Sequence, residues 1–200
     1  MGLGAGALIG AIAYELVPEA AIAGPITSVA FLLGALVFFV GDWIVDHRGG
    51  AERTDIAAAT SGSGAAIFIG TLLDGIPESI VLGLSLALGG GISVAFLVAV
   101  SISNLPEGIA GTLNLAAAGV PRRRILAMWI ILVLVSAACA AFGYGIIGML
   151  SEADGRLAQA FAAGAMLTML ADAMMPEAFE HGGKVVGLAT VLGFMLAALL

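Results

Sequence analysis

The sequence has little charge for a chain of its length. Only 10% of its 200 residues are charged, whereas 61% are hydrophobic and the mean hydropathy is +1.14. A water-soluble domain carries about 25% charged residues, so this chain lacks the polar side chains to cover a surface that faces water. The high hydrophobic content also excludes intrinsic disorder. The composition therefore predicts an integral membrane protein.

Cysteine and basic residues are scarce as well. Cys139 is the only cysteine, which excludes a disulfide scaffold. Seven basic residues stand against fourteen acidic ones, which gives a formal net charge of -7 and a pI near 4.5. Nucleic-acid-binding proteins have the opposite excess. We therefore expect a lipid bilayer and no nucleic acid among the partners.

Long apolar stretches dominate the chain. A helix needs roughly 20 apolar residues to cross the hydrocarbon core of a bilayer, and glycine, proline or charged residues separate the stretches. We predict an all-α membrane protein, with one transmembrane domain over residues 1–200. Its seven helices are expected at about 2–19, 25–46, 61–88, 92–117, 123–149, 158–180 and 184–200.

The basic residues predict an orientation for these helices. If the chain alternates between the two sides of the membrane, Arg48, Arg53, the arginines at 122–124 and Lys184 fall on one side, and only Arg156 falls on the other. Loops rich in lysine and arginine stay in the cytoplasm. We predict a multi-pass protein of the cell (inner) membrane, with a cytoplasmic N-terminus and an external C-terminus.

Two pairs of segments repeat within the chain. Ala-Gly-Ala at 5–7 precedes Pro-Glu-Ala at 18–20, and the same two tripeptides recur at 163–165 and 176–178 with the same spacing. The segment 74–80 resembles 103–109. In the predicted topology, the members of each pair run in opposite directions, as in the inverted repeats of secondary transporters. The repeat also predicts a partner for the stretch 123–149 ahead of residue 1, so we expect that this helix either has been lost or lies upstream of this start.

Two Pro-Glu pairs lie deep inside apolar stretches, at Pro77-Glu78 and Pro106-Glu107. Proline removes a hydrogen bond from a helix, so we predict kinks at both prolines. Asp74 lies four residues before Glu78, on the same helix face. An intramembrane charge costs on the order of 3 kcal/mol, which a bound cation or protonation would offset. The alternative is that each proline begins a helix, which Asp74 or its repeat counterpart caps.

The polar residues of the two segments form a candidate metal site. Oxygen donors of this kind bind hard or borderline divalent ions. The predicted ligands are Asp74, Glu78, Ser103, Asn104 and Glu107. Glu15, Asp172 and Glu177 are candidates for a pathway through the first and sixth spans. Pairing with backbone or water is the alternative for Glu15 and Asp172, and a helix start after Pro176 is the alternative for Glu177.

These motifs resemble those of the ZIP (Zrt-, Irt-like) divalent metal transporters. That family carries a His-Asn-x-Pro-Glu-Gly type motif, which is repeated on the next helix. The segment 103–108 is similar to this motif, with Ser103 in place of histidine, and the segment 74–79 is similar more loosely. Residues 163–182 look like the penultimate helix of the family. The resemblance covers essentially the whole chain.

The resemblance implies a fold, a site and a cargo. ZIP proteins have eight helices in a three-two-three inverted arrangement, with the metal between the fourth and fifth, so this chain would lack the first family helix. By position, Asp74 and Ser103 stand where the family has histidines, and Glu78 and Glu107 stand at its ligand glutamates. A site with fewer imidazoles suits zinc less and manganese or iron(II) more. The resemblance implies import of zinc, iron(II) or manganese into the cytoplasm.

Other functions remain open at this level. An intramembrane metal-dependent hydrolase would use a metal-bound water, but the sequence contains no His-Glu-x-x-His stretch. A ZIP-like relative without transport activity is a further alternative. For partners, a homodimer is a candidate assembly. We expect no enzymatic activity and no organic cofactor.

Overall fold

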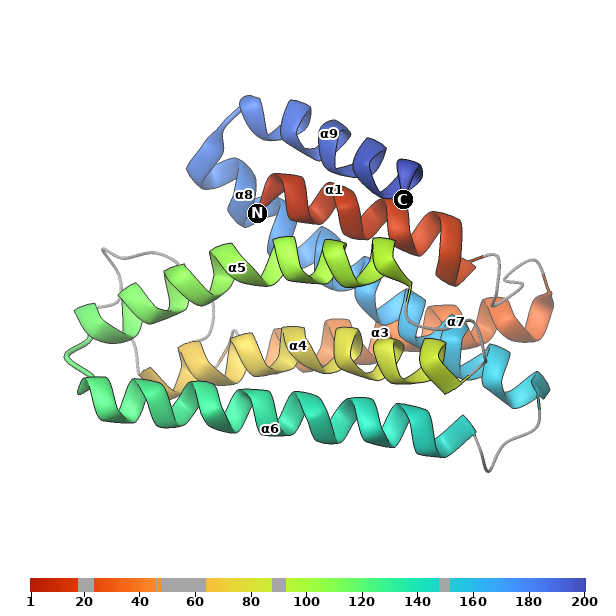
Figure 1. The fold of residues 1–200 in the computed structure, drawn as a ribbon, viewed down its shortest axis with the longest axis horizontal. Helices are drawn as coiled ribbons and strands as arrows, with labels where there is room; N and C mark the ends of the chain where they lie inside the picture. The colour runs from red at the N-terminus through yellow and green to blue at the C-terminus, as the bar shows by residue number, and fades with distance from the viewer. Residues whose placement is uncertain (18–23, 46, 48–63, 88–92, 148–151) are drawn as a thin grey trace.

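The computed structural model describes residues 1–17, 24–45, 47, 64–87, 93–147 and 152–200, which are helical and contain no strand within these ranges. The elements are α1 (Gly2–Ala11), the π-helix η1 (Ile12–Leu16), α3 (Pro25–Val45), α4 (Gly64–Ala87), α5 (Val94–Ala117), α6 (Arg122–Ile147), α7 (Glu152–Met169), the π-helix η4 (Leu170–Met174), α8 (Met175–Gly182) and α9 (Val185–Leu199). The predicted all-α fold is confirmed in this part of the chain. Successive long helices alternate in direction (Figure 1).

Within the described residues, five helical segments are long and apolar enough to cross a membrane. They are α3, α4, α5, α6 and the continuous α7–η4–α8 segment. The segments Gly2–Leu16 and Val185–Leu199 are apolar but shorter. Large apolar side chains such as Leu32, Val133 and Leu192 are well exposed, as expected for helices that face lipid. The structure therefore fits a membrane protein with several spans.

All described basic residues except Arg156 gather at one end of the bundle. Three arginines, 122–124, lie at the start of α6, and Lys184 lies between α8 and α9. These two places lie at the same end of the molecule, whereas the start of α7, with Arg156, lies at the other end (Figure 1). This distribution agrees with the charge pattern behind the predicted orientation, and the orientation itself stays a prediction.

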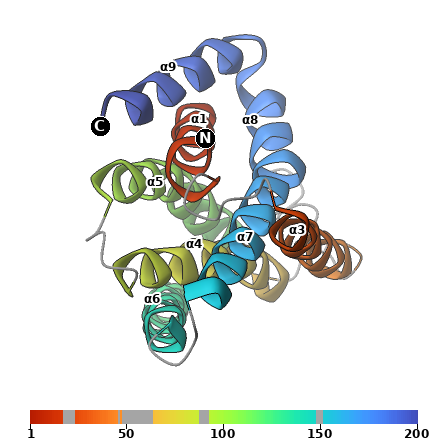
Figure 2. The same ribbon diagram turned by 90° about the vertical axis from the view of Figure 1, so that its right-hand side faces the viewer.

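The first internal repeat is also a repeat of packing. α3 packs along α7, and α9 packs along α1 (Figures 1 and 2). A Cβ on Gly34 would overlap the backbone of Phe161, and a Cβ on Gly193 would overlap the backbone of Leu3. Gly164 and Gly6 make the reciprocal close approaches, to the backbones of residues 31 and 190. Small residues let membrane helices approach closely, so both crossings depend on glycine at repeat-equivalent positions.

Both copies of the repeat contain a π-helix at the same place. η1 covers residues 12–16 and η4 covers residues 170–174. The separation between these two segments along the chain equals the separation between Gly6 and Gly164. A π-helix is a local widening of the α-helix and is frequent at functional sites. Each of the two carries one acid, Glu15 or Asp172. The repeat therefore extends to local backbone geometry.

The remaining helices pack onto these pairs. α4 pairs with α6, and α5 lies against α1. The α4–α6 crossing is close because Gly83 lies against the backbone of Ala140, and Gly143 lies against the backbone of Ile80. The main core joins α1, α4, α5 and α7 through buried side chains that include Leu8, Leu84, Phe96, Met166 and Met169. This core places α4 and α5 side by side.

Candidate functional site

Glu78 lies at the centre of a polar group that it forms with Ser103 and Asn104. Its side chain is 4% exposed. Ser103 Oγ donates to Glu78 Oε1 at 3.3 Å, and Asn104 Nδ2 donates to Glu78 Oε2 at 2.6 Å. The structure therefore brings together three of the five predicted ligands, from two antiparallel helices.

The group lies near the middle of both spans. Glu78 is the eleventh of the twenty residues in Phe68–Ala87, and Ser103 and Asn104 are the tenth and eleventh of the 24 residues in Val94–Ala117. Transporters built from inverted repeats bind their substrates near the bilayer midplane. The position of the group agrees with that arrangement.

Both prolines of the motif lie inside helices. α4 continues past Pro77, and α5 continues past Pro106. The alternative in which each proline begins a helix, capped by Asp74 or Ser103, is therefore wrong. The N-cap of α5 is Ser93, whose side chain accepts a hydrogen bond from the backbone of Phe96 at 2.9 Å.

The other two predicted ligands line a small neighbouring cavity. Asp74 comes from α4 and Glu107 from α5, and Glu177 of α8 joins them. The cavity has a volume of about 20 Å³, close to the space that one water molecule needs. Asp74 is 8% exposed and lies one turn before Glu78. Four carboxylates from three helices therefore lie in or next to one region between α4 and α5.

Glu177 lies inside a continuous helix. Pro176 and Glu177 stand in the first turn of α8, but α7, η4 and α8 form one uninterrupted helical segment. The alternative in which a helix begins after Pro176 is therefore wrong at this position. Glu177 lines the cavity with Asp74 and Glu107.

The two acids in the π-helices lie elsewhere. Glu15 Oε1 accepts a hydrogen bond of 2.6 Å from the hydroxyl of Ser93, at the start of α5. Asp172 is exposed. Neither residue lines the cavity of Asp74 and Glu107. Glu15 therefore pairs with a side chain, a partner that neither the pathway interpretation nor its alternative named.

Several polar residues of the core were missed in the sequence. Thr71 lines the small cavity, one helical turn before Asp74, and the spacing of three residues could have indicated it. Asn114 and Gln159 are almost completely buried. An amide inside an apolar span is a detectable signal, because a buried amide needs hydrogen-bond partners.

The available donors at the site are oxygens. Among the described residues, no three His, Cys, Asp or Glu side chains are arranged as a metal centre. Carboxylates, a hydroxyl and an amide are present instead, and this donor set suits hard or borderline divalent cations more than soft ones. A cation would have to draw the carboxylates together or use Ser103 and Asn104 as well.

Comparisons with other proteins identify no relative of the chain. No family model, curated protein or solved structure matches it.

Proposed function

We propose that this protein transports a divalent metal cation across the membrane through the carboxylates between α4 and α5. The observation that carries the proposal is the position of Glu78. This carboxylate is buried near the middle of a span, where it holds Ser103 and Asn104 of the neighbouring helix. A buried carboxylate in a membrane is expensive, and a positively charged cargo gives it a function.

The adjacent cavity supports a path for that cargo. Asp74, Glu107 and Glu177 line it from three helices, so an ion that leaves Glu78 would meet further carboxylates one helical turn away. Asn104 at present offers its amide nitrogen to Glu78. Rotation of this amide by half a turn would present its oxygen to a cation instead. We propose zinc, iron(II) or manganese as cargo and import into the cytoplasm as the direction, on the basis of the ZIP resemblance.

Metal uptake by proteoliposomes tests this proposal. The purified chain is reconstituted, and uptake of Zn²⁺, Fe²⁺ and Mn²⁺ is measured with a fluorescent indicator inside the vesicles. We expect Glu78→Gln and Glu107→Gln to lose uptake, because each removes one charge and preserves the shape of the side chain. Glu180→Gln is the matched control, since Glu180 is an exposed acid near the end of α8. Uptake of all three metals at the parental rate by both site variants would refute the proposal.

A further inference from the structure

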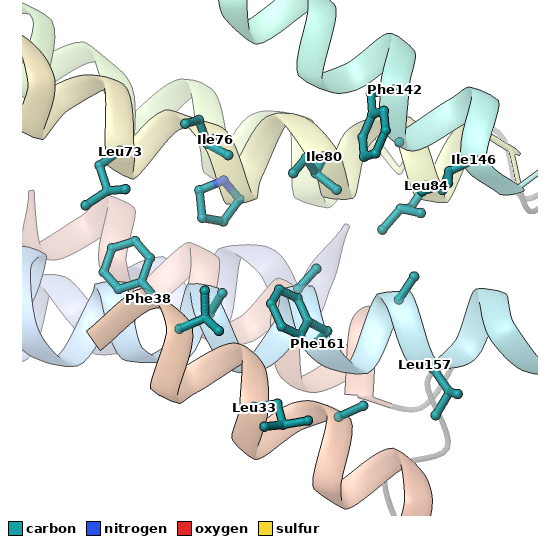
Figure 3. Close-up of a pocket in the computed structure, with 17 residues that line it drawn as sticks. Leu33, Phe38, Leu73, Ile76, Ile80, Leu84, Phe142, Ile146, Leu157 and Phe161 are labelled. Carbon is teal, nitrogen blue, oxygen red and sulfur yellow. The ribbon is translucent and has the colours of Figure 1, made fainter. Parts of the chain in front are cut away.

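A large apolar cavity lies on another face of α4. Its volume is about 540 Å³, and it separates the α3–α7 pair from the α4–α6 pair (Figure 3). Pro77, Ile80 and Leu84 line it from α4, Phe38 from α3 and Phe161 from α7. Phe38 of α3 points toward Leu73 of α4 across this space (Figure 3).

The lining offers nothing to a polar ligand. Every residue that lines the cavity is aliphatic, aromatic, proline or glycine. Apolar cavities of this kind stay dry and take up hydrocarbon ligands. Cations and lipid headgroups are therefore excluded as occupants, and a hydrocarbon group remains.

The cavity is open to the surroundings of the helix bundle. Leu33, Val37 and Phe142 at its rim are 50%, 58% and 61% exposed, whereas Leu84 and Phe38 are 1% and 4% exposed. The rim residues belong to helices that are able to cross a membrane. In a bilayer, acyl chains are the hydrocarbon groups that surround such a rim.

The length of the cavity matches that of an acyl chain. The lining residues on α4 extend from Leu73 to Leu84, which corresponds to about 16 Å of helix axis. One leaflet contributes about 15 Å of the hydrocarbon core. The apolar lining therefore has the length that one acyl chain covers within a leaflet.

We propose that this cavity binds one acyl chain of a bilayer lipid. The acyl chain enters between α3 and α6, lies along α4 and contacts the ring of Pro77. Glu78, the next residue, points to Ser103 and Asn104 of α5. The bound chain fills the gap between the two helix pairs, and its binding does not depend on the transport proposed above.

Photolabelling with a lipid probe tests the proposal. The protein is reconstituted in phosphatidylcholine vesicles that contain a phosphatidylcholine with a diazirine in its acyl chain. Labelled peptides are identified by mass spectrometry. We expect labelling to concentrate at Phe142, Phe161 and Leu33. In the variant Ala158→Phe, which fills the cavity from α7, labelling at these residues should fall to the level of the outer face of α6.

The matched control is Ala127→Phe, which adds the same ring at an exposed position of α6. It should preserve the labelling of the cavity, and circular dichroism checks that both variants are folded. Uniform labelling of all exposed apolar positions would overturn the proposal, and so would unchanged labelling in folded Ala158→Phe. Cross-links from a photoreactive residue at position 161 to a second protein chain would identify a protein as the occupant and would also overturn it.

Discussion

α4 and α5 carry similar Pro-Glu segments in different surroundings. In α4, Glu78 is buried, and Gly83 lies against the backbone of α6. In α5, Glu107 is only half-buried, and an open groove of about 330 Å³ runs along Asn104, Gly108 and Thr112. The repeated segment is similar in both helices, so the burial of its glutamate depends on the helices that pack against the segment.

The residues of the α5 groove have counterparts under α6. In the alignment of 74–80 with 103–109, Asn104 corresponds to Gly75, and Thr112 corresponds to Gly83 if the alignment is extended. Gly75 and Gly83 both lie next to α6 residues. No helix in the described part of the chain covers the groove of α5 in the way that α6 covers α4. This asymmetry explains why similar segments produce one enclosed carboxylate and one partly open carboxylate.

The largest difference is expected between glycines of the two helices. A Cβ on Gly83 would overlap the carbonyl oxygen of Ala140, whereas a Cβ on Gly108 would meet nothing within 4 Å. We expect Gly83→Leu to destabilise the protein by on the order of 3 kcal/mol, because the backbones would have to separate. Gly108→Leu should have little effect. Thermal unfolding in detergent measures both variants, and equal losses would show that the groove of α5 is covered.

A smaller effect is expected at the hydrogen bond between α4 and α5. Asn104→Leu removes the 2.6 Å donor of Glu78 and leaves a buried carboxylate with less compensation. We expect a loss of about 2 kcal/mol in unfolding free energy. In the double variant with Glu78→Gln, part of this loss should be recovered, because the remaining group is neutral. A double-mutant cycle in detergent measures the coupling, and purely additive losses would contradict it.

The sequence predicted the spans better than their contacts. Runs of about twenty apolar residues are visible without coordinates, so the helices begin and end close to the expected residues. α7 is an exception, since it begins at Glu152 and not near 158. Its first turns contain Glu152, Asp154 and Arg156. Because these residues are charged, a search for apolar runs does not detect this part of the helix. The two π-helices were not predicted, because the hydrophobic pattern does not distinguish a π-helix from an α-helix.

The site was predictable in part for a similar reason. The spacing of four residues and the repeat placed Glu78 near Ser103 and Asn104, because antiparallel neighbours bring matching segments together. Glu177 was a pathway candidate, but its position beside Asp74 and Glu107 depends on how α8 packs. Glu177 is far from Asp74 and Glu107 along the chain, so no local sequence pattern indicates that they lie together. The apolar cavity was equally invisible, since its residues look like ordinary core or lipid-facing positions.

The start of α5 provides a prediction of intermediate size. Ser93 accepts a hydrogen bond from the backbone of Phe96 and donates one to Glu15. Because none of the described helices covers the groove of α5, this anchor should matter more for α5 than a cap usually does. We expect Ser93→Ala to cost about 1–2 kcal/mol, and Ser93→Thr to retain most of the stability. Hydrogen exchange of the first turn of α5 measures the effect, and unchanged exchange in Ser93→Ala would contradict it.

The smallest expected effect concerns a side-chain hydrogen bond between α5 and α6. Trp129 Nε1 donates to Thr112 Oγ1 at 3.0 Å, at the edge of the α5 groove. Thr112→Val preserves the shape and removes the acceptor, so we expect a loss of about 1 kcal/mol. In a Trp43→Phe background, Trp129 is the only tryptophan, and its emission should move to shorter wavelength when the indole loses its partner. Thr112→Ser is the control, because it keeps the hydroxyl. If Thr112→Val leaves both emission and stability unchanged, this hydrogen bond does not help to hold α5, and the contrast with α4 becomes larger.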